Sequence, residues 1–308
     1  MGTQFDNLWV EKYRPKTFDD IVLSVDNKQI LEDVLSKNEI PNLLFIGTPG
    51  IGKTSLAKII VKDSLQCQYL YINASDENGI ETIRSKVTNF SKTRSIDGRI
   101  KAIILDEVDG LTMDAQRALR NTMEEYSAFT RFILTANYNH RVIPAVQSRC
   151  QSFNLVPPLT EYNERINYVL KGEEIDVSAE QDEQIRGVIR SLYPDLRKAI
   201  NFIQKCCSSG QFVLNQSDNG DFANQVFTLV QKGAVLKLRK IIIENEEKFN
   251  SDYQHLLRDL FNEIEKSTVK DIKKKEWLLI VAEHLYRSAF VMDQEINFFS
   301  CLIALSKH

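Results

Sequence analysis

Short apolar runs alternate with amphipathic stretches along the first half of the chain. Nearly continuous apolar runs are typical of parallel strands covered on both faces, and they occur at residues 42–47, 68–73, 102–106 and 132–136, with a fifth expected at 152–156. The intervening stretches have helical spacing at residues 53–63, 80–92 and 113–126, the last preceded by Thr112 as an N-cap. This alternation predicts an α/β fold with a parallel sheet.

The second half of the chain has a different pattern. Pro157 and Pro158 mark a linker, because proline cannot continue a strand or enter a helix interior. Beyond them the spacing is helical, at residues 161–171, 179–192, 195–207, 222–231, 234–244, 251–265 and 276–306, and the basic residues 266–275 are interpreted as a solvated turn. The polar residues 215–221 are typical of a boundary. We therefore expect an α/β domain at 1–158, a small helical domain at 159–220 and a C-terminal helical domain at 221–308.

The composition is that of an ordinary globular protein. The 308 residues include 39 basic and 42 acidic side chains, for a net charge of −3, and 43% are hydrophobic. These values exclude bulk disorder, collagen-like repeats and a histone-like basic protein. No apolar run approaches the roughly 18 residues of a membrane-spanning helix, and residues 1–10 lack a secretory signal pattern. We expect a soluble intracellular protein without a membrane partner, in the nucleus, nucleoid or cytoplasm according to its host.

Cysteine and histidine do not indicate a disulfide framework or a metal centre. The five cysteines contain no CxxC pair, and the adjacent Cys206 and Cys207 are poorly placed to bridge distant segments. The four histidines lack metal-ligand spacing. We expect reduced, mostly buried thiols and structural histidines.

Residues 47–54 read GTPGIGKT and fit the phosphate-binding pattern GxxxxGK[ST] between a predicted strand and a predicted helix. Glycines let backbone amides converge on phosphates, and the helix N-terminus adds partial positive charge. We expect Lys53 to neutralise the β- and γ-phosphates of ATP and the Thr54 hydroxyl to ligate Mg²⁺. The nucleotide-contacting residues expected here are Gly47, Thr48, Pro49, Gly50, Ile51, Gly52, Lys53, Thr54 and Ser55.

Residues 103–109 read IILDEVD, in which the two carboxylates of Asp106 and Glu107 stand at the end of an apolar strand. Acids at a strand end can serve as caps, but two of them emerging from a buried strand are costly without a balancing cation. We expect Asp106 to hold the Mg²⁺ shell and Glu107 to polarise a water for attack on the γ-phosphate. Together with the P-loop, this acid pair predicts an ATPase.

Three further polar residues have two interpretations each. Asn137 follows the next strand, where it would orient the attacking water or simply begin a loop. Arg149 would be an arginine finger offered to a neighbouring subunit or a surface ion pair. Arg197 would report the γ-phosphate to the helical domain or be an exposed helical arginine.

The near-neutral net charge conceals a basic segment. Residues 83–101 hold six basic side chains against Asp97 alone, a local net charge of +5. Such a run is either a solvated helix face or a contact for the nucleic-acid backbone, and the residues alone leave both open.

Several motifs, in this order and spacing, resemble the small ATPase subunits of sliding-clamp loaders, the replication factor C type within the AAA+ superfamily. The resemblance covers about residues 9–205 and is weaker in the C-terminal domain. It is carried by EKYRP at 11–15, TFDDI at 17–21, the P-loop, NASD at 73–76, DEVD at 106–109, DAQRALR at 114–120, ME at 123–124, TANY at 135–138, QSRC at 147–150 and DLRKAIN at 195–201. The SRC and EKYRP motifs are more specific than the P-loop.

The resemblance implies an AAA+ domain followed by a helical lid and a helical collar for oligomerisation. It also implies that Val10, Glu11, Lys12, Tyr13 and Val22 lie by the adenine, that Arg149 reaches the ATP of the adjacent subunit and that Arg197 is a sensor on the lid. Family members form pentamers with other clamp-loader subunits, open a ring-shaped sliding clamp when ATP binds and grip primer-template DNA. DNA then triggers hydrolysis and release of the clamp.

The same resemblance suggests DNA-backbone contacts at Arg84, Thr112 and Arg141, with Lys86 as a further member. Such contacts read duplex shape and charge. One departure is Asn78, which stands where relatives often have Lys or Arg, so one expected phosphate contact is missing. Two alternatives are another AAA+ DNA-remodelling ATPase and a structural clamp-loader subunit that binds nucleotide without hydrolysing it. The second is disfavoured by the intact Lys53 and Glu107.

Overall fold

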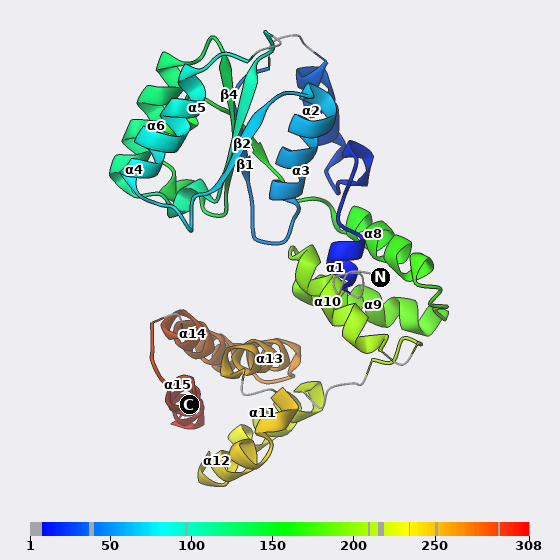
Figure 1. Ribbon diagram of the computed structural model, residues 1–308. Coiled ribbons are helices and arrows are strands. Elements are labelled where there is room, and N and C mark those ends of the chain that lie inside the picture. Colours follow the sequence, from blue (N-terminus) through cyan, green and yellow to red (C-terminus); the bar gives the residue numbers. More distant parts are fainter. Residues whose placement is uncertain are drawn as a thin grey trace. The chain divides into compact units, whose positions relative to one another are not determined.

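The computed structural model describes residues 8–36, 40–95, 98–208, 210–214, 219–233, 235–249, 252–288 and 290–307. The chain divides into two units, Met1–Val213 and Leu214–His308, which are coloured from blue to green and from yellow to red in Figure 1. The expected division at residue 158 stays a prediction, because both parts belong to the first unit, and residues 215–218 of the expected boundary lie outside the described residues.

A parallel sheet of five strands forms the centre of the first unit. The strands are β1 (Leu43–Ile46), β2 (Tyr69–Asn73), β3 (Lys101–Asp106), β4 (Thr130–Ala136) and β5 (Gln151–Asn154). Their order is β2-β3-β4-β1-β5, and every pair is parallel. The five apolar runs of the sequence therefore correspond to the five strands, and the predicted α/β fold is confirmed.

Successive residues of each central strand enter different cores. Phe45 and Ile104 belong to a cluster on one face of the sheet, while Leu44, Ile103 and Leu105 belong to a cluster on the other. Because side chains alternate along a strand and both faces are covered, the strands are apolar throughout.

Helices cover both faces of this sheet (Figure 1). One face is covered by α2 (Val25–Leu35) and α3 (Lys53–Ile59), which continues as the π-helical turn η2 (Ile60–Leu65). The other face is covered by α4 (Ile80–Thr82), the π-helical η3 (Ile83–Val87), α5 (Thr88–Lys92) and α6 (Met113–Glu125). The predicted helix at 80–92 thus contains a widened turn, where the Thr88 hydroxyl donates to the carbonyl of Ile83 at 2.9 Å.

Several short elements were not predicted. They are α1 (Trp9–Lys12), η1 (Phe18–Asp20), η4 (Val108–Gly110), η5 (Asn139–Arg141) and α7 (Pro144–Gln147), and the longer α2 was missed as well. Helix α2 is capped by the Ser24 hydroxyl, which accepts from the amide of Asn27 at 3.3 Å. Most of these elements are one turn long, too short to show a helical period.

Three helices complete the first unit. These are α8 (Leu159–Gly172), α9 (Ala179–Leu192) and α10 (Leu196–Cys206). Their positions agree with the sequence pattern, and α9 has the predicted bounds. The short α1 joins them, because the amide of Trp9 donates to the side-chain oxygen of Gln204 on α10 at 3.1 Å.

The second unit is helical. It consists of α11 (Asn219–Gln231), α12 (Val235–Glu244), the 3₁₀ turn η6 (Glu246–Phe249), α13 (Tyr253–Lys266), α14 (Asp271–Arg287) and α15 (Gln294–Lys307) around one apolar core. None of the helices that the structure describes is long and apolar enough to cross a membrane.

Two predictions for this unit were wrong. The single helix expected at 276–306 is the pair α14 and α15, because Asp293 interrupts it by accepting from the amide of Ile296 at 3.0 Å as an N-cap. Buried His284 and Asn297 then pair across the two helices at 2.9 Å. The basic residues 266–275 are not one solvated turn, since α13 ends at Lys266 and α14 begins at Asp271.

None of the five cysteines is in a disulfide, and Cys207 and Cys301 are buried. The other three are half-buried, so the expectation of mostly buried thiols was too strong. Burial raises the pKa of the Cys150 and Cys301 thiols to about 12.

Candidate active site

The P-loop connects β1 to α3 and is closely approached by the beginning of α10. Gly50 has a φ of +82°, in the left-handed region that favours glycine. A Cβ at this position would collide with the Asp195 carboxylate and would approach the Cβ of Arg197. The glycine therefore serves the backbone turn and also lets α10 lie against the loop.

Lys53 is buried at the first position of α3, with 5% of its surface exposed. Its ammonium donates to the carbonyls of Gly47 at 2.7 Å and Thr48 at 2.8 Å, and to the side-chain oxygen of Asn137 at 2.8 Å. Burial lowers the pKa of Lys53 to about 8. None of the carboxylates in the described part of the chain forms an ion pair with it. A buried cation held only by neutral oxygens fits an anionic ligand such as a nucleotide phosphate.

Asp106 ends β3 and faces the hydroxyl of Thr54. The Thr54 hydroxyl lies 2.9 Å from one carboxylate oxygen and 2.8 Å from the other. The Thr135 hydroxyl donates to Asp106 at 2.6 Å, and the Tyr71 hydroxyl donates to it at 3.0 Å. A carboxylate beside a threonine hydroxyl at a P-loop is a donor set that Mg²⁺ accepts, so the residues fit the expected cation.

Glu107 follows Asp106 with its backbone in the left-handed region, at a φ of +58°. This conformation is uncommon for a residue other than glycine. The Glu107 amide donates to the Thr135 hydroxyl at 2.9 Å, and the Ser75 hydroxyl donates to the Glu107 carboxylate at 2.6 Å. The turn thus directs the two neighbouring acids to different partners.

Asn137 follows β4 and is held through its backbone. The Asp109 carboxylate accepts from the amides of Asn137 and Tyr138, each at 3.1 Å. Because β4 lies between β1 and β3, its end brings Asn137 between the P-loop and the acid pair.

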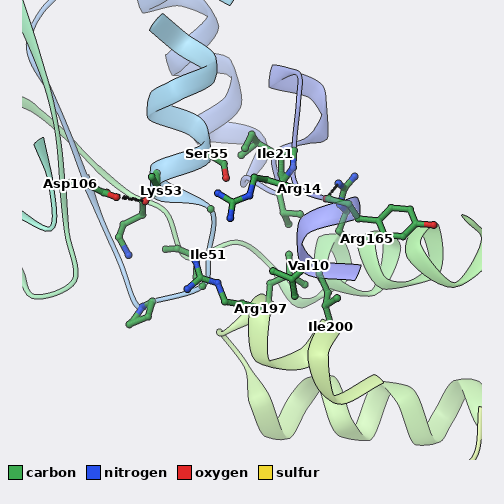
Figure 2. A pocket seen from close by; sticks show the side chains of 18 of the residues that line it. Val10, Arg14, Ile21, Ile51, Lys53, Ser55, Asp106, Arg165, Arg197 and Ile200 are labelled. Atoms are coloured by element: carbon green, nitrogen blue, oxygen red, sulfur yellow. Dashed lines mark hydrogen bonds between the residues drawn. The ribbon is translucent and has the colours of Figure 1, made fainter. Parts of the chain in front are cut away.

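One pocket brings most of these residues together with the N-terminal segment and α10 (Figure 2). Lys53 and Asp106 lie at one end, and Val10, Arg165 and Ile200 lie at the other. The predicted residues that line it are Val10, Tyr13, Val22, Pro49, Gly50, Ile51, Gly52, Lys53, Thr54, Ser55, Asp106, Glu107, Asn137 and Arg197. The buried ammonium of Lys53 at the first end is suited to a phosphate, and the apolar side chains of Val10 and Ile200 at the other end offer a surface for a base.

The pocket lining omits four residues that were predicted to bind the nucleotide. Gly47 and Thr48 are directed to Lys53 through their carbonyls. Glu11 accepts two hydrogen bonds from Arg14, at 3.0 and 2.6 Å, and these bonds lower the pKa of the Glu11 carboxyl. Lys12 forms an ion pair with Glu173 at 2.7 Å.

Other residues of the pocket were missed by the sequence analysis. They are Arg14, Pro15, Ile21, Arg165, Leu196 and Ile200. Arg165 on α8 donates to the carbonyl of Tyr13 at 2.8 Å and lies 3.7 Å from the Asp20 carboxylate. Arg165 therefore connects the N-terminal segment to helix α8. Nothing in its helical sequence pattern distinguishes it from a surface arginine.

Arg149 is not among the residues that line the pocket. It follows α7, where its guanidinium contacts the Glu124 carboxylate on α6 and donates to the carbonyl of Ala145 at 2.6 Å. Arg149 thus forms an ion pair within this chain, as the interpretation as a surface ion pair requires. It is also outside its own nucleotide pocket, as an arginine finger for a neighbouring subunit would be.

Two of the predicted DNA-contacting residues, Thr112 and Arg141, lie by α6. Thr112 caps this helix by accepting from the amide of Ala115 at 3.3 Å, and its own amide donates to the carbonyl of Asn78 at 3.1 Å. Arg141 lies over the ring of Tyr138, with 4.7 Å between the guanidinium carbon and the ring centre. The Arg141 carbonyl accepts from Gln116 on α6 at 3.0 Å, which connects η5 to that helix.

The basic segment at 83–101 is not one continuous charged surface. Arg84 is exposed and lies 3.8 Å from the Glu81 carboxylate, and Lys86 forms an ion pair with Glu77 at 2.6 Å. Lys101 is buried in β3, with 1% of its surface exposed, and donates to the Phe90 carbonyl and to the Thr93 hydroxyl. The count of +5 therefore overstates the charge that a ligand would meet, and Asp97 lies outside the described residues.

Comparisons with known proteins agree with this site. Residues 43–158 match the model of the ATPase family associated with various cellular activities (AAA). A replication factor C small subunit from Archaeoglobus fulgidus is 32% identical over 97% of this chain and 97% of its own length. Replication factor C subunit 3 from Schizosaccharomyces pombe is 38% identical over 67% of this chain and 61% of its own length.

Among solved structures, a single-substitution variant of RuvB from Thermotoga maritima has a TM-score of 0.57 and 16% identity, over 94% of this chain and 90% of its own length. At this identity the likeness shows the fold alone. The sequence relatives identify the family. Because a replication factor C small subunit matches nearly the whole chain at 32% identity and the AAA model covers the sheet with its P-loop, this chain belongs to the replication factor C small-subunit family and is an AAA ATPase.

Proposed function

We propose that this ATPase is a subunit of a DNA polymerase clamp loader, which uses ATP binding to open a ring-shaped clamp and place it on primer-template DNA. DNA-triggered hydrolysis then releases the clamp. The observation that carries the proposal is the convergence of Lys53, Asp106, Glu107 and Asn137 in one pocket that Arg197 of α10 also lines. The names of the relatives support the clamp-loading role.

The pocket residues divide the work of hydrolysis by their chemistry. Lys53 binds the β- and γ-phosphates, since the described residues give its buried ammonium only neutral hydrogen-bond partners. Thr54 and Asp106 would hold Mg²⁺, which when bound supplies positive charge to the phosphate oxygens. Glu107 accepts the proton of the attacking water, and its Ser75 contact orients the carboxylate. Arg197 lines the same pocket from α10 and would sense the γ-phosphate from the lid.

The end of the pocket that holds Val10 and Ile200 is suited to the adenine. Val10 from the N-terminal segment and Ile200 from α10 lie there (Figure 2), and Tyr13 and Val22 line the same pocket. Since both segments contribute to one pocket, nucleotide binding would hold α10 against the P-loop. This coupling is the physical basis for a lid that responds to ATP.

We further propose that the protein acts in a pentamer with other clamp-loader subunits, in the nucleus or in the nucleoid and cytoplasm of its host. Arg149 supports a neighbour-directed role because it is outside its own pocket. The exposed Arg84 and the helix start at Thr112 support a DNA-backbone contact. Another AAA+ DNA-remodelling ATPase remains the alternative, with the same pocket but no dependence on a clamp.

Replacement Glu107→Gln tests the proposal. Gln keeps a side-chain oxygen for Ser75 but does not accept a proton, so ATP binding should persist while clamp- and DNA-stimulated turnover falls by at least about 10²-fold. The control is Glu183→Gln, which alters an acid near Arg190 on α9, outside the pocket. Undiminished turnover in Glu107→Gln would refute the catalytic role, and hydrolysis by the wild-type protein that ignores clamp and primed DNA would favour the alternative.

A further inference from the structure

Three hydroxyl groups surround the carboxylate of Asp106. Thr54 bridges both oxygens, at 2.9 and 2.8 Å, Thr135 donates to Oδ1 at 2.6 Å, and Tyr71 donates to Oδ2 at 3.0 Å. Thr54 belongs to the P-loop helix, whereas Thr135 and Tyr71 come from the two strands on either side of β3. Each carboxylate oxygen thus has one donor from a neighbouring strand in addition to Thr54.

Tyr71 reaches Asp106 from the edge of the sheet. It lies on β2 opposite Ile104, two residues before Asp106 on β3, so both side chains project from the same face. The Tyr71 ring is 38% exposed and lies beneath the ammonium of Lys58 on α3, 4.2 Å from the ring centre. Strand pairing and the Lys58 contact therefore hold the ring in place before any ligand arrives.

We propose that Tyr71 is a positioning residue that orients Asp106 for Mg²⁺ beside the nucleotide. The proposal rests on the proposed function, in which Thr54 and Asp106 hold the cation. A free carboxylate rotates about its terminal bond, but donors on both oxygens hold Asp106 in the orientation that faces Thr54. The loss of one such outer partner typically weakens metal affinity by about 10- to 100-fold. Because Tyr71 is partly exposed, we expect the lower end of this range.

The test separates metal binding from nucleotide binding. A fluorescent ATP analogue is titrated into the full chain, first in EDTA and then at increasing Mg²⁺ concentrations, for wild type, Tyr71→Phe, Tyr69→Phe and Asp106→Asn. Tyr71→Phe removes only the hydroxyl. Tyr69→Phe is the matched control, since Tyr69 lies two residues earlier on β2 and packs against the apolar cluster of the same face.

We expect Tyr71→Phe to bind the analogue normally in EDTA and to require about tenfold more Mg²⁺ for the tightening that the cation produces in wild type. Tyr69→Phe should match wild type in both conditions. An unchanged Mg²⁺ requirement in Tyr71→Phe overturns the positioning role, and so does an equal loss of binding with and without Mg²⁺, which would mark a general structural defect. If Asp106→Asn keeps the wild-type Mg²⁺ response, the proposed metal site itself is wrong, a failure distinct from that of Tyr71.

Discussion

The ammonium of Lys53 donates to the side-chain oxygen of Asn137 at 2.8 Å, which links the P-loop helix to the end of β4. A lysine ammonium only donates, so the Asn137 atom that faces it is the amide oxygen. The amide nitrogen is then the group that remains to donate toward a phosphate or a water. This arrangement gives Asn137 two separable tasks.

Replacement of Asn137 distinguishes the two tasks. Asn137→Asp keeps an acceptor for Lys53 but loses the donor, so we expect kcat to fall by roughly 10²-fold. Asn137→Ala loses both groups and should also weaken ATP binding. Steady-state kinetics with nucleotide titrations will measure both effects. If Asn137→Asp hydrolyses ATP at the wild-type rate, the residue only supports Lys53.

Arg149→Ala should leave the variant's own ATP binding intact, because Arg149 does not line its own pocket. Hydrolysis at the neighbouring subunit should fall by about 10³-fold if the guanidinium acts there. Mixed assemblies of wild-type and variant subunits will show whether the loss follows the neighbour. Arg149→Lys is the matched control for charge, since an ammonium cannot reproduce the planar fork that contacts Glu124 and Ala145. Lost ATP binding in the variant subunit itself would contradict a role in trans.

Primer-template binding should depend on Arg84 and Arg141. Neutralising either residue to Gln should reduce the slope of log affinity against log salt concentration by about 1, whatever the DNA sequence. Fluorescence anisotropy at several salt concentrations, with the assembled complex, will measure the slopes. Arg186→Gln on α9 is the control, since Arg186 is engaged with Asp182 in the helical part of the first unit. If Arg84→Gln and Arg141→Gln have the same salt slope as the wild type and Arg186→Gln, the two arginines are solvated surface charges that do not contact DNA.

The buried Lys101 predicts a pH dependence of stability. Burial lowers its pKa in the folded protein below the ordinary value of 10.5. At a pH between the folded-state pKa and 10.5, Lys101 is more fully protonated in the unfolded chain than in the folded protein. The contribution of Lys101 to the free energy of unfolding therefore rises with pH. Urea unfolding at several pH values from 7 to 10, compared with Lys101→Met, will isolate it. The wild type should gain on the variant as the pH rises, and a constant difference would show that Lys101 is not desolvated.

The sequence predicted the parts of the fold that depend on local pattern. Five apolar runs became five parallel strands, and helix α9 has the predicted bounds. The predicted helix bounds were wrong where a single side chain overrides the pattern. Asp293, for example, caps a new helix within a stretch whose apolar spacing predicted one continuous helix. One-turn elements such as α1 and α7 were missed because they are shorter than the helical repeat.

The nucleotide-binding residues could be predicted from the sequence because phosphate binding needs its residues at fixed spacing in one loop, as in residues 47–54. The acid pair could be predicted because Asp106 and Glu107 are consecutive. The partners of these residues depended on the folded sheet. Tyr71 and Thr135 meet at Asp106 only because β2 and β4 flank β3, and Lys101 is withdrawn from the basic segment only because its strand is buried. Distance along the chain carries no information about such meetings, since strand order sets them and strand order arises from packing.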